Sequence, residues 1–416
     1  MRKSLAVILV SSAVLLSSGA MAQDLDPASD TTRYLFDSAL YMAAGLGALL
    51  FVFAYGLRDV GFARTQNAPA VCLRTIGLIS VTAFAFWIIG YNLIHMIEKG
   101  GLLGPFEAWL PDDVDPLSLG YASGVHWFFQ MGVAAMPAAI VASALSERIK
   151  LWPFLLFTAC LAGLAHPIIA AWVWGGGYFA DAWRVYDFGG AGPIHVAGGA
   201  AALAGAIVVG PRPGRYQTDA IRPAPTTALP LAAFAAGLVV ISLLLVFGGL
   251  SGSFASVEAA VTLGAILTNS VLAVGGAVLA GIMLTQIVYK RAGLMTAINA
   301  AVAGLVAISA DPASPALWQA AMIGAVGGVI VTVAPPFLDR FRIDDAGFVV
   351  PTHFLCGLWG LIIVPWSNPD AWFPGQLLGA AAIAAFSFVL SLLVWTALKY
   401  SIGVRQAPLE EPAMAE

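Results

Sequence analysis

Two histidines stand in the same short pattern at two distant places in the chain. Asp187 precedes His195 by eight positions, and Asp345 precedes His353 by the same interval. Each copy also has a proline two residues before the histidine and a glycine four residues after it, namely Pro193, Pro351, Gly199 and Gly357. Imidazole donates and accepts hydrogen bonds and takes up protons near neutral pH. The pattern therefore predicts a pair of groups that could guide an amine or relay a proton.

The surroundings of both copies are strongly apolar. The chain has 416 residues, of which 60% are hydrophobic and only 10% charged, which indicates a polytopic membrane protein. The net charge of -4 argues against a nucleic-acid partner. A lone histidine in such a chain is usually a satisfied core residue. Two at equivalent positions favour one shared pathway, because an ionisable group inside a bilayer is costly.

Hydropathy predicts eleven transmembrane helices after a signal peptide at 1–22. We expect the helices at 36–57, 71–95, 122–146, 151–177, 194–210, 228–250, 258–288, 293–310, 317–335, 348–366 and 373–400. With the mature N-terminus outside, fourteen basic residues fall on the inner side and three on the outer side. That bias predicts an outside N-terminus, a cytoplasmic C-terminus and a bacterial-type inner membrane.

This topology places the two histidine motifs on opposite sides of the membrane. Asp187 falls in an outer loop and Asp345 in an inner loop, so the membrane domain, 23–403, is expected to contain an inverted repeat of five plus five helices. The halves would span 34–211 and 228–367, with an extra helix at 373–400 and a short cytoplasmic tail at 404–416. The predicted fold class is an all-α polytopic membrane protein.

At these residues the chain resembles the ammonium transporter, methylammonium permease and Rhesus family. The fragments that carry the resemblance are ARTQN, WIIGYNL, ALSERIK, WVWGGG, DFGGAGPIHVAGG and RIDDAGFVVPTH, which stand in one order along nearly the whole chain. The resemblance implies a homotrimer with one narrow apolar pore per subunit and His195 and His353 at its centre. It assigns Asp187 to the support of an outer cation site and of the entry to the fifth helix. It also assigns Trp174 to cation–π recruitment, Ser253 to the vestibule, and Asp345 to capping the helix that follows it.

The resemblance fails at the pore entrance. Family members usually stack two phenylalanines there, but beside the retained Gln130 the first position is Val133. The second position is Gly249, with Phe247 two residues earlier. Phe129 or Phe247 could substitute for the missing rings, although a wider entrance is the simplest expectation. The tail also lacks the elements associated with control by a PII-type protein, so that partner is doubtful.

Three function classes stay open on the sequence. The first is an ammonium or ammonia channel or transporter in a lipid bilayer, in which the cation loses its proton because an apolar pore penalises charge. The second is a divergent member that senses ammonium or carries a larger, methylated amine. The third is a redox protein whose histidine pair ligates haem. No nucleophile constellation or metal-type cysteine spacing occurs, which favours a non-enzyme without a cofactor or a metal. Arg58 and Asp59 suggest an interfacial ion pair.

Overall fold

The computed structural model describes residues 28–217, 221, 226 and 228–406. The predicted signal peptide and residues 407–416 of the predicted tail lie outside this part. The described part is helical and contains no strand, only two isolated bridges. Nine of its helices are long and apolar enough to cross a membrane, and two shorter apolar helices accompany them. The chain is an all-α polytopic membrane protein, as predicted.

The eleven segments follow the predicted order. The first segment is α2 (Asp30–Phe62), and the second is continuous from η2 (Thr65–Asn67) through α3 (Ala68–Ala85) and η3 (Phe86–Gly90) to α4 (Tyr91–His95). The third is α6 (Ser123–Ala144), and the fourth runs through α7 (Leu151–Cys160), η4 (Leu161–Ala165) and α8 (His166–Val173). The fifth consists of η5 (Ala191–Val196) and α10 (Ala197–Val209). The second half has α11 (Leu229–Leu250), α12 (Val257–Tyr289), α13 (Leu294–Ile308), α14 (Leu317–Arg340), and η6, α15 and η7 (Val350–Leu355, Cys356–Ile363, Val364–Trp366). Then comes α16 (Phe373–Ser401). Two short helices, α5 (Pro116–Leu119) and α9 (Tyr178–Asp181), lie in loops.

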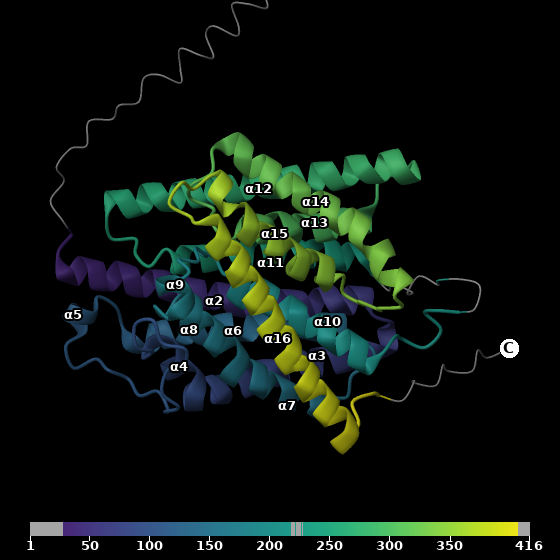
Figure 1. Ribbon diagram of the computed structural model, residues 1–416, viewed down its shortest axis with the longest axis horizontal. Helices are drawn as coiled ribbons and strands as arrows, with labels where there is room; N and C mark the ends of the chain where they lie inside the picture. Colours follow the sequence, from purple (N-terminus) through teal and green to yellow (C-terminus); the bar gives the residue numbers. More distant parts are fainter. Residues whose placement is uncertain (1–27, 218–220, 222–225, 227, 407–416) are drawn as a thin grey trace, which may run out of the picture.

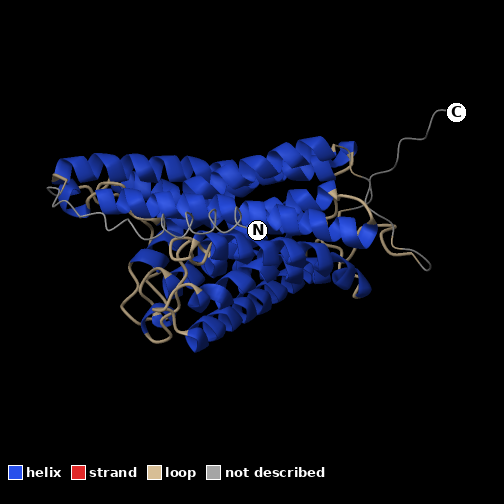
Figure 2. Cartoon of the chain, turned by 90° about the horizontal axis from the view of Figure 1, so that it is seen from above, coloured by secondary structure: helices blue, strands red, loops and turns tan. Residues whose placement is uncertain are grey.

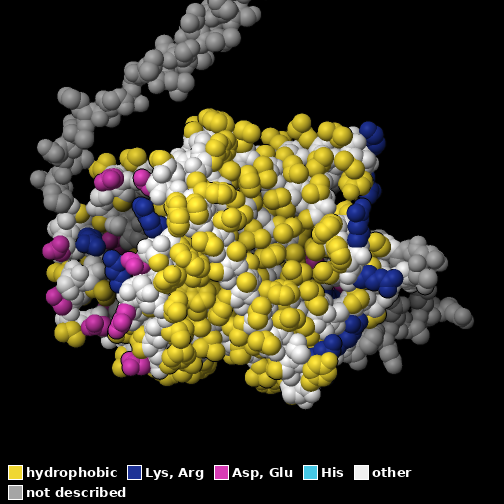
Figure 3. Space-filling view, viewed as in Figure 1, with side chains coloured by type: hydrophobic (Ala, Val, Ile, Leu, Met, Phe, Trp, Pro, Cys, Tyr) yellow, Lys and Arg dark blue, Asp and Glu magenta, His cyan; other side chains and the backbone are white. Residues whose placement is uncertain are grey.

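Most helices run along one common direction and form a bundle (Figures 1 and 2). The last helix, α16, crosses them obliquely in Figure 1 and packs against α10 and α15. Figure 3 shows hydrophobic side chains over the middle of the visible face, acidic side chains together with some Lys and Arg at the end that carries α5, and Lys and Arg at the opposite end. We call these the outer and inner ends, after the predicted topology. An apolar belt between two charged ends is the surface that a bilayer requires.

The two histidine motifs fold alike. Each opens a membrane segment with a short π-helix, η5 for the first and η6 for the second. The end of α10 lies near the start of η6. Arg212, just after α10, and Asp344, just before η6, form an ion pair of 2.9 Å. The two segments therefore run in opposite directions past one another.

Glycines of the two motifs make that crossing close. A β-carbon added at Gly199 would lie 2.5 Å from the backbone nitrogen of Phe354. One added at Gly357 would lie 3.0 Å from the carbonyl oxygen of Ala191 and 3.3 Å from Cβ of His195. A side chain at Gly199 would clash with backbone that cannot move away. The shared glycines thus let the backbones approach until the histidines meet.

Candidate functional site

The two motif histidines are in direct contact. Nδ1 of His195 lies 3.0 Å from Nδ1 of His353, and the ring centroids are 4.9 Å apart. Both side chains are fully buried. A hydrogen bond between two Nδ1 atoms requires a proton on one of them and a lone pair on the other. The pair is therefore a site where one proton can be shared between η5 and η6.

Tyr55 of α2 completes the contact on one side. Its hydroxyl is hydrogen-bonded to Nε2 of His353, whereas Nε2 of His195 has no hydrogen-bond partner among the described residues. Phe51, one turn earlier on α2, packs on the Tyr55 ring with centroids 4.6 Å apart and reaches His353 edge-on at 6.3 Å. Tyr55 stands outside the motifs in the sequence, and its one signal there is that a tyrosine within an apolar helix needs a polar partner for its hydroxyl.

The geometry of the pair does not fit axial ligation of a haem iron. Facing nitrogens in hydrogen-bond contact leave no space for a metal between them, and the other nitrogen of His353 is taken by Tyr55. Iron ligation would require the rings to separate and turn. The described residues also contain no group of three or more His, Cys, Asp or Glu arranged to hold a metal ion.

Asp187 is committed to the start of its own helix. Its Oδ1 accepts hydrogen bonds from the backbone N–H groups of Gly190 and Ala191, both at 2.9 Å, and its Oδ2 accepts one from Gly192 at 2.7 Å. Free N–H groups at a helix start attract a carboxylate. Both oxygens therefore fix η5, and the geometry favours a capping role over direct contact with a cation.

Trp174 and Ser253 are the other two predicted recruitment residues, and they form hydrogen bonds with different parts of the fold. The half-buried indole of Trp174 donates from Nε1 to the carbonyl oxygen of Asp187 at 2.7 Å, which ties it to the start of η5. The hydroxyl of Ser253 donates to the carboxylate of Asp37, with its oxygen 2.9 Å from Oδ1. Trp174 is thus held beside the motif, while Ser253 is part of a turn anchored on α2.

Phe129 fills the space at the predicted gate. A β-carbon at Gly249 would lie 2.4 Å from Cβ of Ala44 and 2.8 Å from Cζ of Phe129. Tyr41 stacks on Phe129 with centroids 5.7 Å apart. Phe129, one of the two substitutes that the sequence suggested, therefore lies in the space beside Gly249.

The remaining predicted entrance residues are buried. Val133 is a fully buried core residue, and Phe247 packs on Phe188 with centroids 6.5 Å apart. Gln130 is 7% exposed, and its amide nitrogen lies 3.4 Å from Nε2 of His126 while its oxygen has no partner among the described residues. The amide oxygen of Gln130 is therefore free to accept a hydrogen bond near the predicted entrance.

Aromatic rings cluster around His126 at the outer end, which the sequence analysis did not assemble. Nδ1 of His126 is 2.8 Å from the hydroxyl of Tyr91, and its ring meets Tyr41 at 4.8 Å, Tyr121 at 4.9 Å and His95 at 5.0 Å. These residues come from α2, α4, α6 and the loop between them. Their spacing along the chain carries no period, so only the fold reveals the cluster.

At the inner end, Asp345 repeats the capping role of Asp187 in weaker form. Its Oδ2 accepts from the backbone N–H of Val350 at 2.7 Å, and its Oδ1 has no partner among the described residues. The helix-capping role expected for Asp345 agrees with this contact. The contrast with Asp187 means that only the outer motif is fully capped.

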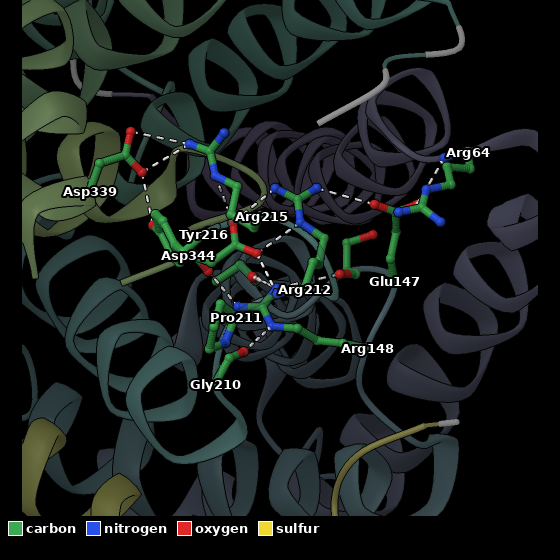
Figure 4. Close-up of polar contacts among 12 residues, drawn as sticks. Arg64, Glu147, Arg148, Gly210, Pro211, Arg212, Arg215, Tyr216, Asp339 and Asp344 are labelled. Atoms are coloured by element: carbon green, nitrogen blue, oxygen red, sulfur yellow. Dashed lines mark hydrogen bonds and ion pairs between the residues drawn. The ribbon is translucent and has the colours of Figure 1, made fainter. Parts of the chain in front are cut away.

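A cluster of charged side chains holds the inner loops together (Figure 4). Arg212 pairs with Asp344 at 2.9 Å and with Glu147 at 3.1 Å, and Arg215 pairs with Asp339 at 2.9 Å. Burial alone would raise the pKa of Asp344, but hydrogen bonds and charge from Arg212 lower it to about 2. These contacts fasten the loop after α10 to the segment that leads into η6 and so help to place His353.

Arg58 and Asp59 do not form the interfacial ion pair that the sequence suggested. Arg58 is fully buried and donates from Nη2 to Oδ1 of Asn299 at 3.2 Å and to the carbonyl oxygen of Gly347. Asp59 turns elsewhere and accepts from the hydroxyl of Ser143 at 2.5 Å. Adjacent residues on a helix point about 100° apart, which is why sequence neighbours of opposite charge need not pair.

Comparison with known proteins identifies the family. The chain belongs to the Ammonium Transporter Family, because the sequence model of that family matches residues 39–414. A putative ammonium transporter of Synechocystis is 27% identical over 407 residues, which cover 96% of this chain and 91% of that protein. An ammonium transporter of Archaeoglobus fulgidus is 27% identical over 439 residues, covering 97% of this chain and 91% of the relative.

Solved structures show the same fold. One described as a sensor Amt protein aligns with a TM-score of 0.83 at 24% sequence identity and covers 91% of this chain and 97% of its own. Mep2 of Candida albicans aligns with a TM-score of 0.81 at 21% identity, covering 91% and 88%. The helical architecture predicted from hydropathy is therefore that of the Amt and Mep proteins.

Proposed function

We propose that this protein carries ammonium or ammonia across a membrane along a path centred on His195 and His353. The observation that carries the proposal is the buried contact between their Nδ1 atoms at 3.0 Å. Two imidazoles from opposite halves offer a donor and an acceptor to a small amine in an otherwise apolar interior. The family and the ammonium transporters among the relatives support the same substrate.

The outer end is proposed to recruit the cation and the interior to pass the neutral amine. Trp174, Tyr41 and the rings around His126 present aromatic faces, which attract cations. The unpaired oxygen of Gln130 is placed to accept an N–H group below them. A bare cation pays a large desolvation cost in an apolar path, so release of a proton before passage is the cheaper route. Asp187 acts by fixing η5, and Ser253 by anchoring its loop.

The surrounding organisation is proposed from the same reasoning. We infer a homotrimer in a bacterial-type inner membrane, with the mature N-terminus outside after removal of residues 1–22 and the C-terminus in the cytoplasm. We retain halves at 34–211 and 228–367, the extra helix at 373–400 and no requirement for a cofactor or a PII-type regulator. The antiparallel crossing of η5 and η6 supports the repeat.

The test is ammonium-triggered current in proteoliposomes of the purified protein. His195→Ala and His353→Ala should each change the current by at least about tenfold, because each removes half of a shared hydrogen bond and leaves the other imidazole buried without that partner. Cys72→Ala is the control, since Cys72 is an exposed residue of α3 outside the pair. Silence of wild-type protein that is correctly assembled would overturn the transport proposal.

Sensing is the second function that the site supports. The observation in its favour is the closed packing of Phe129 against Gly249 and of Tyr55 against His353, which leaves a binding end without an obvious passage. Ammonium or methylammonium binding by isothermal calorimetry, in protein that gives no current with either, would select the sensor. A current with methylated amines alone would reassign the substrate.

A further inference from the structure

Arg58 is an ionised side chain within a membrane-spanning helix. It lies in α2 and is fully buried. Charge inside a membrane protein is expensive and is retained where it serves a pathway. It lies about one helical turn closer to the inner end than Tyr55, the residue of α2 that contacts His353.

No carboxylate neutralises Arg58 by direct contact within the described residues. Its two acceptors are neutral, the amide oxygen of Asn299 and the carbonyl oxygen of Gly347. Its Nε and Nη1 make no hydrogen bond there. The guanidinium carbon instead lies 4.7 Å from the ring centroid of Tyr55 and 5.0 Å from that of Phe62. Aromatic faces stabilise a cation without cancelling its charge. The carboxyl groups of Asp59 and Asp345 lie close enough to interact electrostatically with Arg58 without forming an ion pair with it. They oppose part of its field, and the remainder acts on Tyr55.

Arg58 also separates the histidine pair from an inner hollow. Tyr55, under the guanidinium, touches His353. On the other side, Asn299 forms part of the wall of a hollow of about 460 Å³. Phe348, whose ring lies 6.5 Å from that of Phe62, is also in this wall. Asp339 and Arg340 line the hollow as well, which places it at the inner end.

We propose that Arg58 is a positively charged plug between the histidine pair and the inner hollow, and that it bars cations while neutral amines pass. The proposal rests on the proposed function, because it assumes that the path runs through the histidines. A fixed cation in a medium of low polarity repels a second cation strongly and does not repel ammonia. Potassium and protonated amines are thus excluded by charge as well as by desolvation.

The experiment measures potassium and ammonium currents in the same proteoliposomes for wild type, Arg58→Met and Arg58→Lys. Methionine keeps an unbranched side chain and removes the charge, whereas lysine keeps the charge. Arg64→Met is the matched control, because Arg64 follows α2 at the inner end but reaches Glu147 at 3.9 Å instead of the path. If Arg58→Met does not elute as a single species in size-exclusion chromatography, Arg58→Gln replaces it as the neutral variant. Glutamine keeps a hydrogen-bond donor for Asn299 and Gly347.

The expected result is a potassium current at least about tenfold above wild type in Arg58→Met, since a repulsive charge is removed from the path. Arg58→Lys and Arg64→Met should stay at the wild-type level. A folded neutral variant that remains closed to potassium while wild type carries ammonium would overturn the plug and leave the proposed function standing. A potassium current in the neutral variant, with no ammonium transport by wild type, would support the plug and reject the function. Absence of both currents would reject both.

Discussion

The hydroxyl of Tyr55 meets Nε2 of His353, whereas the matching nitrogen of His195 has no partner among the described residues. The hydroxyl therefore acts on one histidine of the pair directly and on the other only through the Nδ1 contact at 3.0 Å. When Nδ1 of His353 carries the shared proton, its Nε2 accepts from Tyr55. When it does not, its Nε2 donates to Tyr55. Tyr55 is thus suited to follow either state of the pair.

Tyr55→Phe should therefore reduce ammonium-triggered current without unfolding the protein. The ring and its packing on Phe51 remain, and the loss is one hydrogen bond of about 1 kcal/mol, which corresponds to roughly fivefold in rate. Current in proteoliposomes and the thermal midpoint in detergent measure the two effects. Tyr186→Phe, which changes a tyrosine at the outer end, is the control. An unchanged current in Tyr55→Phe would show that the hydroxyl plays no part in passage.

Gly249→Phe should destabilise the protein. The added ring would enter space held by Ala44 and Phe129, and overpacking of this kind costs about 1–3 kcal/mol. The thermal midpoint of the detergent-solubilised protein should fall, and Phe129→Ala in the same chain should restore part of the loss. Gly264→Phe is the control, because a β-carbon at Gly264 meets nothing within 4 Å. Equal midpoints for Gly249→Phe and wild type would mean that Phe129 does not hold the gate position.

Asp187→Asn separates capping from substrate binding. The amide keeps one oxygen for Gly190 and Ala191 but loses the acceptor that Gly192 uses, so we expect a loss of about 1 kcal/mol in stability. The ammonium concentration that gives half-maximal current should stay near the wild-type value. Asp181→Asn, a second outer carboxylate, is the comparison. A raised half-maximal concentration with unchanged stability would instead make Asp187 a substrate ligand.

Asp344→Asn should lower stability at neutral pH and not in acid. The pKa of Asp344 is lowered from 3.8 to about 2, which corresponds to roughly 2 kcal/mol of stability. Because the folded-state pKa is depressed, this contribution is present above about pH 4 and disappears as the pH falls toward 2.

The measurement for Asp344→Asn is the thermal midpoint in detergent across that pH range. Wild type and variant should differ at pH 7 and converge in acid. Asp112→Asn, on an exposed outer loop, should match wild type throughout. A difference that persists unchanged at low pH would show that Asp344 contributes by packing and not by its charge.

The helices and the histidine pair were accessible from the sequence because each leaves a periodic or repeated signal. Long apolar runs indicated the eleven segments, and the spacing from Asp187 to His195, repeated from Asp345 to His353, predicted that the two histidines line one shared pathway. The role of Gly199 and Gly357 also follows from their matched places in the motif. These features are local in sequence or repeated within it.

The sequence did not reveal the contact of Tyr55, the partners of Arg58 or the choice between Phe129 and Phe247, because these depend on neighbours from other helices. Arg58 stands next to Asp59, and sequence adjacency favoured an ion pair, but their side chains leave α2 in different directions. Phe129 of α6 fills the space beside Gly249 of α11. Pairwise packing across the bundle decides such cases, and no single-segment pattern contains it.

Because Gly199 receives the backbone of one half and Gly357 that of the other, neither histidine can reach its place until both halves have inserted and closed on each other. A chain that is only partly made has no central polar site.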